Sequence, residues 1–405
     1  MLISFLFIVI IYSLLKSTVS RERRCFSLCA IILYIVVSFG DYYWLVFVDG
    51  FPFHPSDPSD YYLITRNLSF RQVLNIESTN IFYYIINWYY NKIWNEPYFI
   101  CILIKLNNIL VFVSAYLLIT RKTSKFTCVD VILLLNPYAM VTIVRNVRDS
   151  YILLFIAMVI VGIGLIPNNH IKKRWLILGL LLMSMTRAVL LIVFAIVLFL
   201  KYNDRLSRTL KCFVLVTCLC LSLYLWKDIV YIISNQFISS MVYMGEDHEQ
   251  YIPLLSGEIS NSILQSFVWR MLIALAVFLF TPHPFNFVIN WLNNMDITGA
   301  CNIYTGFDNF LISCGSVYSY IFVIPIVVAY FFNWEKMGKL NFYFAVGFIV
   351  LYVVAFLGST DIRNRNTAIF IMLSSVITSN FNLRITSVYY LFSLLICLIV
   401  CFFHD

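Results

Sequence analysis

The sequence predicts an all-α fold: a polytopic transmembrane helical bundle of about ten spans with additional re-entrant helices. Of its 405 residues, 61% are hydrophobic and only 12% are charged, whereas a soluble domain carries about 25% charged residues. The apolar residues form long unbroken runs, unlike the alternating pattern of an outer-membrane barrel. Lysine and arginine gather in the short loops between these runs. A water-soluble enzyme is therefore excluded, and the dispersed positive charge disfavours nucleic acid as a partner.

The first segment, residues 1–15, is predicted to be a membrane span rather than a signal peptide. Its cationic residues follow the apolar stretch, in KSTVSRERR, whereas a signal peptide carries them first. The other predicted spans lie at about 26–48, 98–119, 127–144, 150–166, 212–233, 309–332, 340–357, 366–381 and 386–402.

Two apolar segments do not fit a single crossing. The run 175–200 has basic loops at both ends, HIKKR before it and KYNDRLSR after it, so both ends are predicted to face the cytoplasm. A hairpin of two short helices satisfies this condition, with its tip at 183–187 and Arg187 near the outer face. The segment 263–281 would invert everything downstream if it crossed once, so we expect it to be re-entrant or interfacial.

The charges also predict which side each loop faces. Seventeen of the 28 lysine and arginine residues fall in loops predicted to be cytoplasmic, with four of the 20 acidic residues. The opposite, periplasmic side holds two large loops, about 49–97 and 234–308, which are rich in tyrosine, tryptophan and asparagine. Such aromatics are typical of the membrane interface, and they also stack on sugar rings. We expect the whole chain, 1–405, to form one integral membrane domain.

Six arginines lie on the predicted outer side, where the positive-inside rule disfavours them. They come from four separate segments and are Arg145, Arg148, Arg187, Arg270, Arg363 and Arg365. A guanidinium fork binds phosphate oxygens with two hydrogen bonds, so this set favours a lipid diphosphate at the outer leaflet. Two alternatives stay open. The arginines could form unrelated ion pairs with the outer acids, and Arg145 could pair with Asp149 at a helix end.

Candidates for a general base, which takes a proton from an attacking hydroxyl, lie in both outer loops. Asp57 and Asp60, in SDPSDYY, are three residues apart at the start of a predicted helix, where they could equally cap its N-terminus. His248, in GEDHEQ, is the second candidate. His54 and His283 have weaker claims, since a lone histidine in a loop is more often solvated.

Inside the span 98–119, Lys105, Asn107 and Asn108 are predicted to form a polar patch that faces the interior. Lys105 would contact a phosphate there or pair with Asp41. No nucleotide-binding motif and no HExxH motif occurs. The eleven cysteines form no CxxC pattern and no Cys/His ligand spacing, so no metal site is predicted. A nucleotide-sugar donor used in the cytoplasm is disfavoured, which favours a lipid-linked donor.

Several short motifs together resemble a known family. A DxxDYY pattern follows the second span, an NP…RxxRDS segment opens a later span, a proline-aromatic stretch (TPHPF) lies late in the second outer loop, and an RxR precedes the penultimate span. In this layout the chain resembles the Wzy-type polymerases of O-antigen and capsule repeat units, and their relatives among the GT-C membrane glycosyltransferases. It departs from the family in lacking two matching arginine-rich outer loops.

The resemblance implies a GT-C-like fold and a cofactor-free reaction at the periplasmic face of the bacterial inner membrane. A glycan on undecaprenyl diphosphate would be transferred to the non-reducing end of a lipid-linked repeat unit. The six outer arginines and Lys105 would bind the diphosphate, and Asp57 or Asp60 would be the base. A chain-length regulator protein is an implied partner.

Two other functions remain open. One is a GT-C enzyme that adds a single sugar from a polyprenyl monophosphate. Such a donor needs fewer phosphate contacts, so the number of outer arginines favours a diphosphate over it. The other is a flippase for lipid-linked oligosaccharides, which should carry charge along a central cavity and contain internal repeats. No repeat is evident in the sequence.

Overall fold

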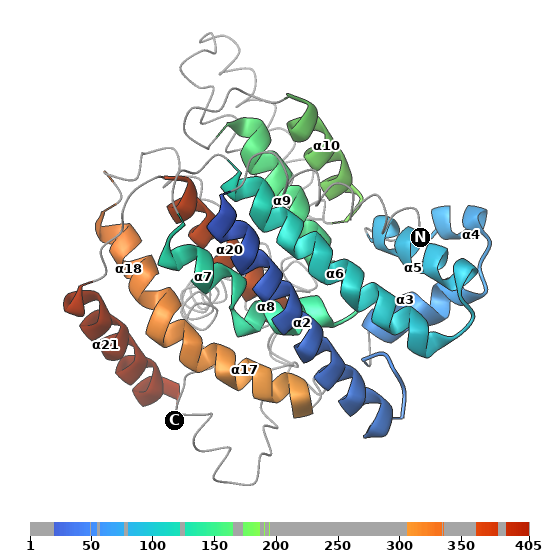
Figure 1. Ribbon diagram of the computed structural model, residues 1–405, viewed down its shortest axis with the longest axis horizontal. Helices are drawn as coiled ribbons and strands as arrows, with labels where there is room; N and C mark the ends of the chain where they lie inside the picture. Colours follow the sequence, from blue (N-terminus) through green and yellow to red (C-terminus); the bar gives the residue numbers. More distant parts are fainter. Residues whose placement is uncertain are drawn as a thin grey trace, which may run out of the picture.

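The computed structural model is an assembly of helices (Figure 1). It describes residues 20–48, 50–54, 57–76, 80–121, 126–164, 173–186, 190, 194, 306–333, 335, 362–379 and 386–404. Every regular element in these ranges is a helix, which confirms the predicted all-α class for the described residues. The predicted spans 1–15, 212–233 and 340–357 and the predicted re-entrant segment 263–281 lie outside them.

The helices differ widely in length. Their bounds are α2 Arg21–Phe47, α3 Asp57–Arg66, α4 Phe70–Leu74, α5 Ile81–Ile93, α6 Pro97–Thr120, α7 Cys128–Leu134, α8 Pro137–Val144, α9 Asp149–Ile163, α10 Lys173–Ser184, α17 Gly306–Tyr318, η3 Ser319–Val323, α18 Ile324–Phe332, α20 Ile362–Thr378 and α21 Ser387–His404. Helix α6 packs against α2 and α9, and α10 covers α9. Helix α8 packs between α17 and α20, and α21 packs on α18. The short helices α3, α4 and α5 form a group at one end of the molecule (Figure 1).

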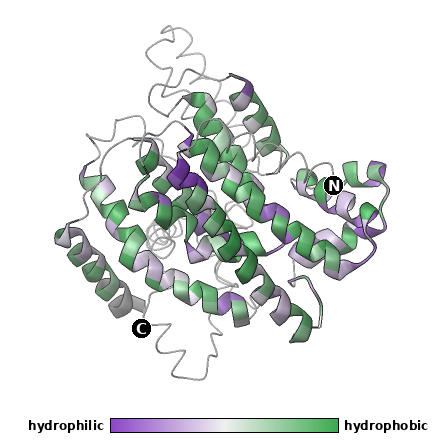
Figure 2. Cartoon of the chain, viewed as in Figure 1, coloured by the Kyte–Doolittle hydropathy of each residue, from purple (hydrophilic) through white to green (hydrophobic). Residues whose placement is uncertain are grey.

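Three helices in the described part are long and apolar enough to cross a membrane: Arg21–Phe47, Pro97–Thr120 and Gly306–Phe332. They coincide with the predicted spans 26–48, 98–119 and 309–332. Shorter apolar helices accompany them, at Cys128–Val144, Asp149–Ile163, Arg174–Ser184, Arg365–Thr378 and Ser387–Leu398. Apolar residues dominate these helices, while hydrophilic residues gather near helix ends and around α3 and α4 (Figure 2).

Helix α2 carries its polar side chains inward and its apolar side chains outward. The buried positions are Arg23, Ser27, Ala30, Tyr34, Ser38, Asp41 and Leu45. The exposed positions include Leu28, Ile32, Val36, Phe39 and Phe47. A surface helix of a soluble protein has the opposite arrangement, with its apolar stripe toward the core. Polar groups that face the bundle and apolar groups that face outward suit a helix surrounded by lipid.

The predicted span 127–144, which coincides with the apolar segment Cys128–Val144, consists of two helices in succession. Helix α7 ends before Asn136, and α8 begins at Pro137. Proline has no backbone N–H and disfavours the helical conformation of the residue before it. Asn136 accordingly has φ −63° and ψ 117°, and its Oδ1 accepts a hydrogen bond from Tyr138 N at 3.1 Å. The asparagine thus ends one helix and caps the next.

The predicted hairpin 175–200 is described in its first half. Helix α10 ends at Ser184, within the stretch predicted as the tip. Met185 O accepts a hydrogen bond from Phe82 N at the start of α5, at 3.4 Å. The chain beyond 186, apart from residues 190 and 194, lies outside the described residues until 306.

A buried ion pair fixes the N-terminal end of α2. Arg23 Nε lies 3.3 Å from Asp130 Oδ1, and both side chains are at most 1% exposed. Asp130 also accepts from Tyr116 Oη at 2.9 Å and from Thr127 N at 2.8 Å. This group lies 18 residues along α2 from Asp41, which is about 27 Å at 1.5 Å per residue. The hydrocarbon core of a bilayer is about 30 Å thick, so the two polar ends of α2 have the spacing of two membrane faces.

Candidate functional site

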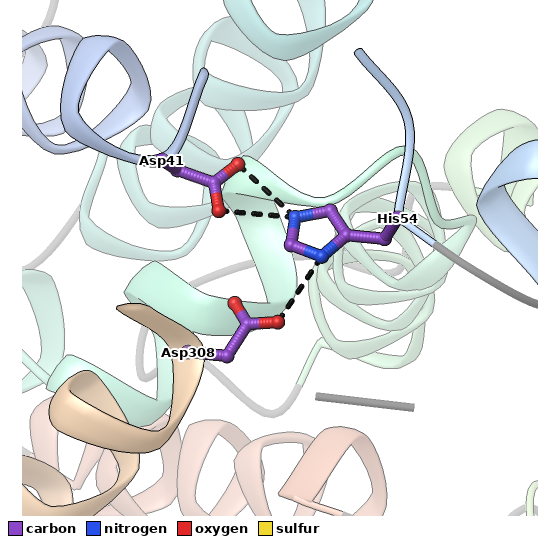
Figure 3. Close-up of side chains that lie close together, drawn as sticks. All are labelled: Asp41, His54 and Asp308. Carbon is purple, nitrogen blue, oxygen red and sulfur yellow. Dashed lines mark hydrogen bonds and ion pairs between the residues drawn. The ribbon is translucent and has the colours of Figure 1, made fainter. Parts of the chain in front are cut away.

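A cluster of five ionisable side chains is buried where α2, α6, α8 and α17 meet. We call Asp41, His54, Lys105, Arg145 and Asp308 the buried charge cluster; each residue is at most 2% exposed. His54 lies at its centre, between the carboxylates of Asp41 and Asp308 (Figure 3). His54 Nε2 is 3.0 Å from Asp41 Oδ1, and His54 Nδ1 is 3.1 Å from Asp308 Oδ2.

The two carboxylates are also neutralised from the other side. Lys105 Nζ pairs with Asp41 Oδ2 and donates to Val144 O at 2.7 Å. Arg145 Nε lies 3.9 Å from Asp308 Oδ2. Of the two roles that the sequence leaves open for Lys105, the structure shows the pairing with Asp41. The partner of Arg145 in this cluster is Asp308, which comes from a distant part of the chain.

The surroundings of His54 favour its protonated, charged form. A neutral imidazole donates through one nitrogen only, and an ionised carboxylate can only accept. A carboxylate near each ring nitrogen favours the form in which both nitrogens carry a proton. Burial alone lowers the pKa of His54, but the charges of Asp308 and Asp41 and their hydrogen bonds outweigh it, so the pKa is raised above its ordinary value.

Asp41, His54 and Asp308 could by spacing hold a metal ion, since one ligand atom from each lies within 4.8 Å of the others. The surrounding charges disfavour this. A divalent cation would have to displace the ammonium of Lys105 from Asp41 and approach the guanidinium of Arg145. The ring nitrogen of His54 that bound the metal would also have to be unprotonated, whereas the carboxylates on both sides favour protonation. The donor set therefore fits an ion-pair network better than a metal centre.

The buried charge cluster lies under an interruption between α8 and α9. Arg145 has an extended backbone, with φ −73° and ψ 153°, and α9 begins again at Asp149. Asn108 of α6 donates to Arg145 O at 3.0 Å. Asn146 donates to Pro58 O at 3.2 Å and to Asn87 Oδ1 at 2.9 Å, and it accepts from Tyr83 Oη at 2.7 Å. The interruption is thus bonded to α3 and α5 of the first loop.

The other face of this interruption carries a second polar group, which is partly exposed. Arg363 Nη1 of α20 lies 2.8 Å from Asp57 Oδ2 of α3, with side chains 22% and 45% exposed. Asp60, one turn along α3, is exposed, and Arg148 is intermediate in burial. Burial raises the pKa of Tyr84, the charges of Asp57 and Asp60 raise it further, and Arg148 opposes them. Arg363 thus pairs with Asp57, and Asp57, Asp60 and Arg148 all act on Tyr84; we call these four charged residues the rim.

Arg365 lies away from the rim and is 4% exposed. Its guanidinium carbon is 5.5 Å from the centre of the Tyr138 ring, and its Nη1 donates to Tyr138 Oη at 3.4 Å. Gly315 leaves room for this ring, because a Cβ there would lie 2.5 Å from Tyr138 Cδ1. Arg365 is engaged within the protein rather than presented to a ligand.

The predicted site residues thus divide into three groups. Asp57, Asp60, Arg148 and Arg363 come together at the rim. Lys105, Arg145 and Arg365 are buried among protein partners. Arg187, His248 and Arg270 lie outside the described residues. The sequence reasoning undervalued His54 and did not select Asp308. The useful signal was the presence of isolated acids, Asp41 and Asp308, inside or at the start of long apolar runs.

No protein family, curated protein or solved structure matches this chain in the comparisons.

Proposed function

We propose that this chain is a membrane-embedded glycosyltransferase that uses a lipid-linked donor, in the manner of a Wzy-type O-antigen or capsule polymerase. The observation that carries the proposal is the rim, where a partly exposed carboxylate pairs with the partly exposed guanidinium of Arg363, and Arg148, of intermediate burial, acts on the same tyrosine as that carboxylate. A proton acceptor next to phosphate-binding forks is what glycosyl transfer from a lipid diphosphate requires. The buried charge cluster would hold the segments that carry the rim in place.

In the proposed reaction, an acceptor sugar hydroxyl attacks the anomeric carbon of the donor glycan. Asp57 takes the hydroxyl proton as the new glycosidic bond forms. The bond from the anomeric carbon to the diphosphate oxygen breaks, and its electron pair leaves with undecaprenyl diphosphate. Arg148 and Arg363 stabilise the negative charge on this leaving group. Asp60 is the second candidate base on the same helix.

The proposal includes the finer architecture that the sequence predicts: about ten spans in a GT-C-like bundle, in the bacterial inner membrane, with the rim facing the periplasm. The outward apolar face of α2 and the bilayer-like spacing of its two polar ends support it. A chain-length regulator is the partner expected of such a polymerase.

One observation favours a second candidate, a GT-C enzyme that adds a single sugar from a polyprenyl monophosphate. Of the predicted phosphate ligands in the described residues, Lys105, Arg145 and Arg365 are at most 4% exposed. Arg148 and Arg363 are the members of that set that a ligand at the rim could reach. Two guanidinium groups are enough to bind one phosphate, as a monophosphate donor requires.

The test is to delete the gene, restore it as variants and separate the cell's lipid-linked glycans on a gel. Asp57→Asn is expected to lower polymer formation by about 100-fold or more, the usual contribution of a general base. Arg363→Ala should also leave one repeat unit per lipid. As controls, Glu96→Gln removes one negative charge and Arg71→Ala removes one positive charge at exposed positions of the same loop. Both variants should still give the ladder of polymer bands.

A full ladder from Asp57→Asn and Asp60→Asn, tested separately and together, would rule out both carboxylates as the base. A shortened repeat unit in the deletion strain would identify the single-sugar enzyme instead. Accumulated precursor on the inner leaflet would indicate a flippase.

A further inference from the structure

The ion pair between Asp57 and Arg363 differs from the other ion pairs described above. In those pairs, the side chains of both partners are at most 3% exposed. Asp57 and Arg363 are 45% and 22% exposed, and they join α3 to α20 across 306 positions of sequence. Solvent-exposed ion pairs contribute little to stability, whereas buried pairs are costly to break. The Asp57–Arg363 pair is therefore one that a ligand can open.

The pair also occupies the two groups that the proposed reaction needs. The Oδ2 atom of Asp57 accepts a hydrogen bond from Arg363 Nη1 at 2.8 Å, so one of the acceptor sites of this carboxylate is already occupied. The N–H donors of Arg363 that face Asp57 are not available to phosphate. As long as the pair is closed, the carboxylate and the guanidinium each occupy part of the other's hydrogen-bonding capacity.

A phosphate group is a stronger partner for Arg363 than the carboxylate is. A phosphate monoester or a lipid-linked diphosphate carries up to two negative charges, against one for a carboxylate, and like a carboxylate it accepts two parallel hydrogen bonds from a guanidinium fork. Arg148 lies in the same neighbourhood and adds positive charge that attracts phosphate. Both features favour exchange of the carboxylate for phosphate at Arg363.

Resting on the proposed function, we infer that Arg363 is exchanged between two partners during the reaction cycle. Asp57 holds it in the free protein, and a phosphate of the lipid-linked donor takes it when the donor binds. In this exchange one ion pair breaks and another forms, with no covalent change. The freed Asp57 oxygens can then accept the proton of the acceptor hydroxyl. The base is thus released by the donor, which favours binding of the donor before the acceptor.

The exchange makes a prediction that involves no sugar. If Asp57 competes with phosphate for Arg363, removing its charge should tighten phosphate binding. The probe is inorganic diphosphate, titrated into the purified full-length protein in detergent at fixed pH and ionic strength, with affinity measured by calorimetry. Asp57→Asn is expected to bind diphosphate about two- to fivefold more tightly than wild type, as the loss of an exposed ion pair allows.

Matched variants separate exchange from general electrostatics. Glu96→Gln removes the same charge at an exposed position of the same loop and should change the affinity by much less. Arg363→Ala should weaken binding, and in Asp57→Asn/Arg363→Ala the gain from Asp57→Asn should disappear. Arg363→Lys, which keeps the charge without the fork, should bind more weakly than wild type.

Equal affinities of wild type and Asp57→Asn would overturn the exchange, as would equal gains from Asp57→Asn and Glu96→Gln, or no binding of diphosphate to any variant. The glycan gel decides the proposed function separately. If Asp57→Asn tightens diphosphate binding but leaves the ladder intact, the exchange stands and Asp57 is not the base. If it abolishes the ladder without changing diphosphate affinity, the function stands and the exchange is wrong.

Discussion

His54 is the residue on which the buried charge cluster depends. Its imidazolium separates Asp41 from Asp308, at 3.0 and 3.1 Å. Its backbone carbonyl accepts a hydrogen bond from Ser59 N in the first turn of α3, at 3.1 Å. One residue therefore links α2 and α17 to the start of the helix that carries Asp57. We regard it as a positioning residue for the rim.

Replacing His54 by alanine should destabilise the protein by about 3–5 kcal/mol, because it leaves two buried carboxylates facing each other without the charge between them. His54→Gln keeps one donor and should lose less. Thermal unfolding of the purified protein in detergent measures both. Arg71→Ala, at an exposed position of the first loop, is the control and should unfold like wild type. Unchanged unfolding of His54→Ala would contradict the assigned role.

The raised pKa of His54 gives this contribution a definite pH dependence. A group whose pKa is higher in the folded state stabilises the protein fully below its unfolded pKa, which is about 6.5 for histidine. The stabilisation is lost as the pH rises through the folded pKa. The free energy of unfolding of the wild-type protein should therefore decrease as the pH rises above about 6.5. The His54→Gln variant should lack this part of the decrease. Parallel pH profiles of the two proteins would contradict this.

Among the elements, the interruption between α8 and α9 has the clearest functional consequence. It turns what could be one apolar helix into two segments and leaves Arg145 to Arg148 as a non-helical link. Arg145 points to the buried charge cluster, and Arg148 lies at the rim. Two arginines only three residues apart can thus reach different surroundings, because the backbone between them is not helical.

Asn146 should be essential to this interruption. Asn146→Asp keeps the shape but replaces two donors by a carboxylate that faces Pro58 O and Asn87 Oδ1. Asn87 cannot turn its amide without losing its own bond to Tyr83 O, at 3.0 Å. We expect the substitution to lower the free energy of unfolding by about 1–3 kcal/mol, as measured by thermal unfolding. Asn75→Asp, at an exposed position of the same loop, should be close to neutral; equal effects would contradict the argument.

Across the whole molecule, the sequence predicted some features well because local signals set them. The predicted span 98–119 matches α6, Pro97–Thr120, since a proline opens it and the apolar run is continuous. The division of 127–144 was signalled by Pro137 but not recognised. Within the buried charge cluster, the pairing of Lys105 with Asp41 was one of two roles that the sequence left open. The meeting of His54 with Asp308 could not be derived, because it depends on how α17 packs beside α2. The pairing of Asp57 with Arg363 depends equally on tertiary packing.

The two polar ends of α2 assign the molecule an orientation that can be tested. The end with Arg21 and Arg24 is predicted to be cytoplasmic, and the end near Asp41 to be periplasmic. In a variant whose eleven cysteines are replaced, a single cysteine is introduced at Gln72 in α4 or at Glu22 in α2; both positions are exposed. Intact cells with a permeabilised outer membrane are then treated with a membrane-impermeant maleimide.

We expect Gln72→Cys to react in these cells, and Glu22→Cys to react only after the inner membrane is opened. Val36→Cys, on the apolar outward face of the same helix, is the third position. It should resist the reagent on either side, since a thiol in hydrocarbon is neither ionised nor accessible to a charged reagent. The reverse labelling of Gln72 and Glu22 would place the rim in the cytoplasm. Because the resemblance to Wzy-type polymerases implies a reaction on the periplasmic side, that result would exclude the proposed polymerase and would favour a function that uses a cytoplasmic donor.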